Sequence, residues 1–274
     1  MSTDKNPGSE GQARGAAADG APARGLPGER PARSFWSGYD VMWGVVPETV
    51  PRRGTGLDRT TIVRAAIAIA DAEGMDAVTM RRVAERLTTG PMSLYRYVSD
   101  KDALVSMMVD QVISESGPEG RDELPSYWRD ALRLVAESIW DVCQAHPWYP
   151  EAIMVRPPLT PNGAAGLELC LSIFDGYEDL DIGTKMLFVG MIQYSVVGAA
   201  LLNVGEGRTR EQLDVTEEQV MEQSAPFMKA LVDSGRYPRV VEFITQAEHI
   251  SEKQEIMRNV DLILDGIATR LPER

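Results

Sequence analysis

The chain has 274 residues, of which 43% are hydrophobic and 25% are charged, and its formal net charge is −13. This composition excludes disorder of the whole chain and allows one sizeable core or two smaller ones. The net charge argues at first against a nucleic-acid partner, but residues 111–274 hold 14 basic and 27 acidic side chains and therefore the whole acidic excess. The first 110 residues are close to neutral.

The N-terminal part is rich in Gly, Ala, Pro and Arg and has no apolar stretch of signal-peptide length, so we interpret residues 1–50 as a flexible, Arg-containing tail. Within it, the apolar patch over residues 35–45 is expected to dock on another part of the chain or to form a short helix. Residues 47–56 are rich in Pro and Gly and indicate a linker.

Helical periodicity begins at Asp58, a good N-cap, and predicts a first helix over residues 58–73. A second, short helix follows Thr79 and stops at the turn over residues 88–91. A third spans residues 91–97 and opens with Pro, where a missing N–H costs nothing. Ser99 is expected to cap a fourth helix in a variant of the capping box. Residues 51–110 thus form a compact helical head.

Beyond this head the apolar spacing stays helical, and no alternating run or fixed repeat predicts strands or a solenoid. The fold class is therefore all-α. The expected helices span residues 126–145, 147–154, 161–174, 182–203, 216–233, 238–249 and 251–271.

Residues 186–205 carry no charged side chain, and this length is close to the ~20 apolar residues of a bilayer span. No Lys/Arg cluster flanks them, so a buried helix of a soluble bundle is favoured over a membrane-associated or purely structural protein. Cys143 and Cys170 lie in apolar helical patterns, which indicates buried filler in a reducing, cytoplasmic environment.

Two short helices at a sharp turn are typical of a helix-turn-helix, whose second helix lies in the major groove of DNA. Arg81, Tyr95 and Lys101 suit phosphate contacts. Leu94 and Val98 are expected in the core. The candidates to face base edges are Pro91, Met92, Ser93, Arg96 and Tyr97, and Arg96 could pair with guanine through two hydrogen bonds.

The head resembles that of the Tet repressor (TetR) family. The residues that carry the resemblance are Thr60-Ile62-Val63-Ala65-Ala66, Ala70-Asp71-Glu73-Gly74, Thr79-Met80-Arg81-Arg82-Val83-Ala84, Ser93-Leu94-Tyr95-Arg96-Tyr97-Val98 and Lys101-Leu104. Weaker likenesses at Trp43-Gly44, Arg53-Gly54 and His146-Pro147-Trp148 point to the subfamily with a Tet-repressor-like C-terminal domain.

The resemblance implies an all-helical homodimer with a three-helix DNA-binding head, a linker helix and a ligand-binding and dimerisation domain over residues 111–274. By position, the DNA contacts fall on Met80, Arg81, Pro91, Met92, Ser93, Tyr95, Arg96, Tyr97 and Lys101. Thr88 stands where the family usually has Gly, so the turn is expected to be strained or differently built. Tyr97 stands where His is frequent.

The predicted function is therefore a DNA-binding transcriptional regulator, with repression favoured and activation left open. By this resemblance a small hydrophobic or antibiotic-like inducer releases it from a palindromic operator, and the controlled gene encodes efflux or resistance. Arg52 and Arg53 adjoin the head, where a flexible arm can reach the minor groove. The expected partners are operator DNA, a second copy of the chain and the inducer.

A pocket in the C-terminal domain is expected to use aromatic and Met side chains with Gln193 and Asn203 as polar anchors. The proposed lining is Trp128, Trp140, Trp148, Phe174, Met191, Gln193, Tyr194 and Asn203. Metal-assisted tetracycline binding is not expected, because Ala152 stands where the namesake's metal-binding His would align. His146 is interpreted as a structural residue at a helix end.

For dimerisation, the last helix offers an apolar stripe, and the 182–203 helix offers Gly190, Gly198 and Ala199 for close approach. Paired across a two-fold axis, these two helices would form a four-helix interface, although such stripes often serve their own subunit. The stripe consists of Ile256, Val260, Ile263, Leu264, Ile267 and Leu271. An enzyme is the main alternative class, but no nucleophile elbow, phosphate loop, metal-spaced cluster or dinucleotide fingerprint is present. We therefore expect no catalytic residue, metal site or cofactor.

Overall fold

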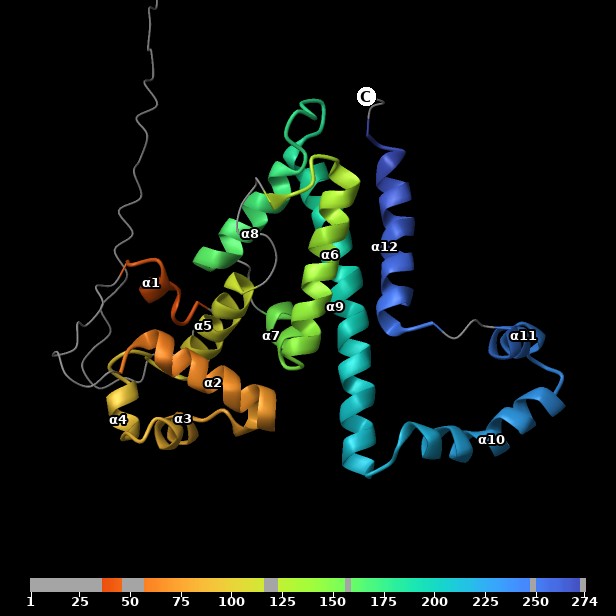
Figure 1. The fold of residues 1–274 in the computed structure, drawn as a ribbon, viewed down its shortest axis with the longest axis horizontal. Helices are drawn as coiled ribbons and strands as arrows, with labels where there is room; N and C mark the ends of the chain where they lie inside the picture. The colour runs from red at the N-terminus through yellow and green to blue at the C-terminus, as the bar shows by residue number, and fades with distance from the viewer. Residues whose placement is uncertain (1–35, 46–56, 116–122, 156–158, 247–249, 272–274) are drawn as a thin grey trace, which may run out of the picture. The chain divides into compact units, whose positions relative to one another are not determined.

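A computed structural model of the chain describes residues 36–45, 57–115, 123–155, 159–246 and 250–271. The described residues contain α-helices and one short 3₁₀ helix and no strand, which confirms the all-α prediction (Figure 1). Arg52 and Arg53 lie outside the described residues.

The head consists of α2 (Arg59–Glu73), the 3₁₀ helix η1 (Met75–Ala77), α3 (Met80–Arg86), α4 (Pro91–Leu94) and α5 (Lys101–Ser114). Ile62, Ala66, Ile69 and Ala70 are all at most 3% exposed and pack α2 on α5, as their spacing predicts. Complete burial of a side chain the size of Ile stabilises the fold by roughly 1.5–3 kcal/mol relative to exposure. This buried face holds the head together.

The side-chain caps of the head helices differ from the prediction in one place. Asp58 and Thr79 accept hydrogen bonds from the backbone N–H groups of Thr61 and Arg82, at 2.7 Å and 3.1 Å, as predicted. Ser99 was the wrong cap for α5, because Asp100 is extended and its carboxylate accepts from the Ala103 N–H at 2.8 Å. An Asp one residue later takes the role that the Ser-x-x-Asp spacing had suggested for Ser99.

The apolar patch near the N-terminus forms α1 (Tyr39–Met42), which packs on α5. Gly38 has a φ of 86°, and a Cβ there would lie 3.1 Å from Ala103, so only Gly fits this close approach. The Ser37 hydroxyl donates to Asp100 at 2.7 Å, and the Trp43 indole donates to the Leu159 carbonyl at 2.8 Å. Residues 36–45 of the predicted tail are therefore folded against the rest of the chain.

The C-terminal part consists of α6 (Trp128–Ala145), α7 (Tyr149–Met154), α8 (Pro161–Ser172), α9 (Ile182–Leu213), α10 (Glu217–Asp233), α11 (Pro238–Gln246) and α12 (Glu252–Ala268). Helices α6, α9 and α12 pack side by side, and α5 contacts both α7 and α8 (Figure 1). Helix α5 therefore links the head to this bundle.

Helix α9 runs ten residues past its predicted end at Asn203 and stops before Asp214, whose φ is 51°. The helix continues through Gly205 and Gly207, because a helix tolerates isolated glycines at a cost of about 1 kcal/mol each. Its stretch Ile182–Arg210 is apolar and long enough to cross a membrane, although a third of its most apolar window (33%) is buried in the subunit.

The apolar stripe of the last helix does not form the free face that dimerisation by this stripe requires. Ile256, Val260, Leu264 and Ile267 are at most 3% exposed and lie in the subunit's own core, where α12 packs on α6 and α9. The alternative of an intrasubunit face is therefore correct for these four residues. The amphipathic pattern of α12 could not distinguish its own core from a partner's.

The two cysteines are buried or partly buried, as expected for apolar filler. Burial raises the pKa of the Cys143 thiol to about 12 and that of the Cys170 thiol to about 11. Both thiols therefore stay protonated and unreactive near neutral pH.

Candidate nucleic-acid interface

The turn between α3 and α4 is a Schellman motif. The Thr89 N–H donates to the Ala84 carbonyl at 2.9 Å, and the Thr88 N–H donates to the Glu85 carbonyl at 3.1 Å. Thr88 has a φ of 51°, the left-handed conformation that this motif requires and that a β-branched residue disfavours. The turn is thus built in the ordinary way, with a strained Thr where Gly is preferred.

Helix α4 spans only Pro91–Leu94, so it is shorter than the predicted 91–97, and hydrogen-bonded turns continue the segment to Val98. Leu94 and Val98 are at most 1% exposed, so they anchor this segment in the core as predicted. Met92 is 78% and Tyr95 is 47% exposed. Pro91 and Arg96 are also exposed and Ser93 is partly so, which leaves most of the predicted base-facing side chains at the surface.

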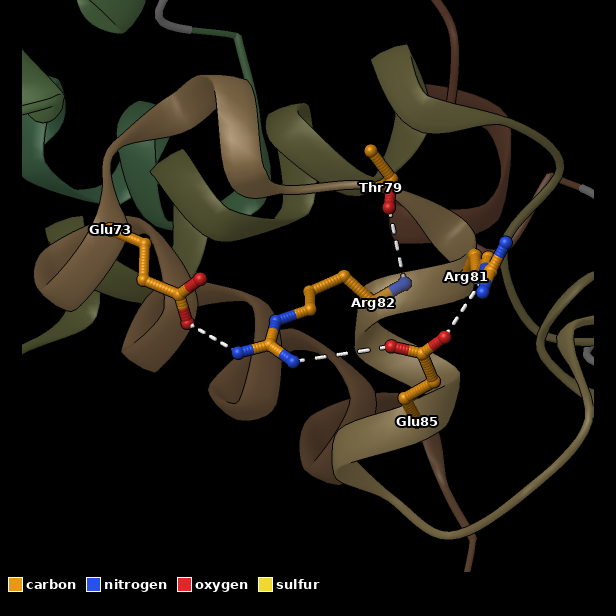
Figure 2. Close-up of polar contacts among 5 residues, drawn as sticks. All are labelled: Glu73, Thr79, Arg81, Arg82 and Glu85. Carbon is orange, nitrogen blue, oxygen red and sulfur yellow. Dashed lines mark hydrogen bonds and ion pairs between the residues drawn. The ribbon is translucent and has the colours of Figure 1, made fainter.

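Helix α3 carries a polar network that separates the roles of its two adjacent arginines (Figure 2). Arg82 donates to Glu73 on α2 at 2.9 Å and its backbone N–H donates to Thr79, so it ties α3 to the preceding helix. Arg81 donates only along its own helix, to Glu85 at 2.8 Å, and its side chain is 84% exposed. Arg81 is therefore the better placed of the two for a phosphate.

The charge of Arg81 is secure at any ordinary pH. Its hydrogen bond to Glu85 is the largest cause that raises the pKa of the guanidinium above its usual value, and the coulombic attraction of Glu85 adds to it. A surface ion pair of this kind contributes little to stability because solvent screens it. DNA phosphates can therefore compete with Glu85 for Arg81 at low cost.

Lys101 lies at the first position of α5 and is exposed. Its ammonium group donates to the Met75 carbonyl at 3.3 Å, which directs the side chain across the head. The preceding cap, Asp100, has a lowered pKa. Desolvation is the largest single influence and raises it, but hydrogen bonds from the Ala103 N–H and the Ser37 and Ser99 hydroxyls together outweigh it.

Two predicted DNA contacts, Met80 and Tyr97, are each only 8% exposed and contribute to the core of the head. The periodicity of such a short helix does not reveal which aromatic residue points inward. The assignment of these two residues to DNA stays a prediction from the family position.

The predicted ligand-lining residues fall into separate environments. Trp128, Trp140 and Phe174 are at most 6% exposed, and Phe174 lies with its ring centroid 5.6 Å from that of Phe188. On α9, Met191 and Tyr194 are 38% and 67% exposed, and Gln193 and Asn203 are partly buried. A cleft of about 280 Å³ between α6 and α12 is lined by none of them; its lining is Arg133, Lys253, Gln254, Met257, Arg258 and Asp261.

Trp148 has a different environment from the other predicted pocket residues. It is 1% exposed, and its indole N–H donates at 2.7 Å to Asp71 on α2 in the head. His146 caps the C-terminal end of α6, which confirms its structural role at a helix end. In the sequence, the His-Pro-Trp motif was the only sign that Trp148 has a special role, and it did not indicate Asp71 as the partner.

In the described part of the chain, no group of three or more His, Cys, Asp or Glu side chains could hold a metal ion.

Two family models match the chain. The model of bacterial regulatory proteins of the tetR family matches residues 62–108, and the model of the tetracyclin repressor-like C-terminal domain matches residues 122–271. The HTH-type transcriptional repressor DrrR1 of Streptomyces coeruleorubidus is 31% identical over 239 residues, which cover 86% of each chain. A class A tetracycline repressor of Escherichia coli is 24% identical over 185 residues, which cover 66% of this chain and 82% of the relative.

Solved structures show the same fold. The ActR protein of Streptomyces coelicolor in complex with actinorhodin matches with a TM-score of 0.64 and 25% identity, over 80% of this chain and 98% of ActR. A complex of the same protein with (S)-DNPA matches with a TM-score of 0.63 and 26% identity, over 78% of this chain and 98% of ActR.

Proposed function

The chain belongs to the tetR family of bacterial regulatory proteins, as a DNA-binding transcriptional repressor and not an enzyme, and from this membership we propose that it works as an inducible homodimer. Two heads would occupy the half-sites of a palindromic operator in the gene's own upstream region. A small hydrophobic or antibiotic-like molecule would release them. The controlled gene would encode efflux or resistance, and the dimer would act in the cytoplasm.

The observation that carries this proposal is the exposed surface of α3 and α4 on either side of the Schellman turn. Arg81 and Tyr95 supply donors for phosphates, Arg96 can reach base edges, and Lys101 opens α5 close by. Because the head is close to neutral overall, affinity would depend on a few placed donors and on two-fold symmetry rather than on a broad basic patch.

The exposed face of α9 supports self-association. Leu187, Met191, Tyr194 and Leu202 recur at helical spacing and are 38–74% exposed, and Gly198 between them has open space around it. Such a stripe suits an isologous contact, in which the same face of two copies pairs across a two-fold axis. It also explains how a helix this apolar can belong to a soluble protein.

The class of inducer is inferred mainly from the ligands of similar proteins. ActR was solved with actinorhodin and (S)-DNPA, and other relatives are tetracycline repressors. Of the predicted lining of a pocket in the C-terminal domain, we keep Trp128, Trp140, Phe174, Gln193 and Asn203. Met191 and Tyr194 are exposed on α9, and Trp148 donates to Asp71 in the head. Metal-assisted ligand binding is not part of the proposal, because Ala152 stands where the namesake's metal-binding His would align.

Binding to the gene's own upstream DNA tests the proposal directly. Titration of a labelled fragment should show a Kd of about 10⁻⁸–10⁻¹¹ M at physiological salt, a two-fold symmetric footprint and weaker binding as salt rises. A fragment of the same composition in scrambled order serves as the control. Equal affinity for both fragments at every salt concentration would contradict specific repression. Actinorhodin is the first inducer to add, and release by it would support an antibiotic-like ligand.

The N-terminal arm is a separate part of the proposal. Arg52 and Arg53 would add minor-groove contacts beside the head. Because α1 packs on α5, deletion of residues 1–50 would also remove a folded element, so the double substitution Arg52→Ala/Arg53→Ala is the cleaner test. A lower operator affinity and a smaller salt slope are expected, and unchanged values would contradict the role of the arm.

A further inference from the structure

Asp71 connects the DNA-binding head to the C-terminal bundle through a single carboxylate oxygen. It lies near the end of α2, and its Oδ1 accepts the indole N–H of Trp148 at 2.7 Å. The Nδ1 of His146 lies 2.8 Å from the same oxygen and donates whenever it carries the proton. Two groups from one loop, 75 and 77 residues away in sequence, thus converge on one acceptor.

The bundle itself holds the Trp148 indole and the loop that carries His146 in place. The His146 N–H donates to Val142 at 2.9 Å, and the Tyr149 N–H donates to the His146 carbonyl at 2.8 Å, so the loop between α6 and α7 is a tight turn. The Trp148 ring is 1% exposed and packs edge-on to Tyr149, with ring centroids 6.2 Å apart. An indole held in this way presents its N–H in one direction only.

The rest of α2 packs on η1, α3 and α5, which are all parts of the head. Helix α5 reaches the bundle through α7 and α8. There the backbone N–H of Asn162 on α8 donates to Oδ1 of Asp110, and the Asn162 side-chain amide donates to Oδ2 and to the backbone carbonyl of Asp110. A head attached through α5 alone could still rotate about that helix. The contact at Asp71 lies on a different helix and opposes such a rotation.

We propose that Asp71 is a positioning residue, which fixes the orientation of the head on the bundle and thereby sets the spacing of half-sites that the dimer accepts. This inference rests on the proposed function for its DNA readout. Charge-assisted hydrogen bonds are stronger than neutral ones, and the Asp71 side chain is only 31% exposed, so the contact retains much of that strength. Loss of the carboxylate should leave each head able to bind DNA but less restricted in angle.

The experiment measures how well the protein tolerates a changed distance between the half-sites. A residue that only stabilises the fold would not change this tolerance. One inserted base pair moves the two half-sites apart by about 3.4 Å and rotates them by about 35°. The experiment compares the affinity of the full-length protein for its operator with that for the same operator lengthened by one base pair. The readout is the affinity for the natural operator divided by the affinity for the lengthened one. In Asp71→Ala this ratio should be about three- to tenfold lower than in wild type, mainly because the variant binds the lengthened operator better than wild type does.

Three further variants make the outcome decisive. Asp71→Asn keeps an acceptor oxygen and should restore most of the wild-type ratio, whereas Trp148→Phe removes only the indole donor and should lower the ratio. Asp76→Ala removes an exposed acid from the same head and should leave the ratio unchanged. Wild-type ratios in both Asp71→Ala and Trp148→Phe, with thermal unfolding that shows folded protein, would overturn the inference.

A measurement without DNA separates this inference from the proposed function. Spin-labelled unnatural amino acids at Arg86 on α3 and Glu168 on α8, both exposed, leave the native cysteines in place. In a sample diluted with unlabelled chain, Asp71→Ala should broaden the distribution of distances between the labels, and Asp76→Ala should not. An unchanged distribution in Asp71→Ala overturns the positioning role, whereas failure of wild type to bind any symmetric operator would overturn only the proposed function.

Discussion

At the scale of single residues, two arginines next to each other in sequence differ in what they can do. Arg82 is held by Glu73 on another helix, whereas Arg81 is 84% exposed and held only by Glu85 within α3 (Figure 2). From the sequence, both are basic residues of the head with no visible difference between them. Only their partners show that Arg82 connects α3 to α2 and that Arg81 pairs within its own helix, which is why we propose Arg81 for the phosphate contact.

Arg81→Ala is expected to weaken operator binding by a similar factor on all sequences, because a phosphate contact carries no base information. The slope of log affinity against log salt should fall by about 1, the value for one lost phosphate contact. Arg64→Ala on α2, which also removes an exposed arginine from the head, is the matched control. Equal salt slopes for Arg81→Ala and wild type would contradict the phosphate contact.

Thr88→Gly is expected to stabilise the protein by about 0.5–1 kcal/mol. The substitution relieves a β-branched residue at a φ of 51°, and this gain exceeds the entropy that Gly adds to the unfolded chain. Urea unfolding midpoints measure the change. Thr89→Gly is the control, since Thr89 does not have a positive φ and Gly there should only destabilise. A lower midpoint for Thr88→Gly would show that the Thr side chain makes contacts worth more than the strain.

At the scale of helices, the caps explain where the head helices begin. Asp58 and Asp100 accept backbone N–H groups at the first turns of α2 and α5, and their carboxylates are favoured there by the positive end of the helix dipole. The hydrogen bond from the Thr61 N–H is the largest cause that lowers the pKa of Asp58. Hydrogen bonds likewise lower the pKa of Asp100 against its desolvation.

These caps predict a pH dependence of stability. A carboxyl whose folded pKa is lowered stabilises the fold above its unfolded value, here 3.8, and this contribution is lost as the pH falls through the lower folded pKa. The double variant Asp58→Asn/Asp100→Asn keeps capping groups but cannot titrate, so its stability should fall less than that of wild type below about pH 4. Denaturant titrations between pH 6 and pH 3 would check this, and parallel curves would contradict it.

At the scale of the whole molecule, one apolar helix serves two surfaces. The buried residues of α9 pack on α6 and α12, while Leu187, Tyr194 and Leu202 are 60–74% exposed. A soluble protein rarely leaves such a stripe open to water. The exposed face of α9, the other helix that the sequence proposed for the interface, is therefore where we expect a second copy to bind, rather than the stripe of α12.

Tyr194→Glu and Leu202→Glu are each expected to convert the proposed dimer into a monomer. A two-fold contact places each new carboxylate twice in one apolar interface, where it cannot be hydrated. Sedimentation should give a mass near the chain mass of 30.1 kDa rather than ~60 kDa, and operator binding should weaken strongly. Met154→Glu on α7, where Met154 is 50% exposed, is the matched control and should remain dimeric. Dimers of unchanged stability in both α9 variants would place the interface elsewhere.

Interactions between neighbours along the chain are enough to predict the start and the buried face of several helices. The period of Ile62, Ala66 and Ile69, the caps at Asp58 and Thr79, and the Pro at the start of α4 all act within one or two helical turns. The same local signals predicted the helix-turn-helix and the resemblance to the family. They placed Leu94 and Val98 correctly in the core.

Contacts between residues far apart in the sequence follow only from how the helices pack together. Nothing along the chain connects Asp71 with Trp148, or shows that Val260 and Leu264 pack within their own subunit while Tyr194 stays exposed. An amphipathic pattern shows that one face of a helix must be buried but not which element buries it. Likewise, a carboxylate in the sequence does not show which group will donate a hydrogen bond to it. Which faces become buried and which polar groups pair depends on how all the helices pack around the same core.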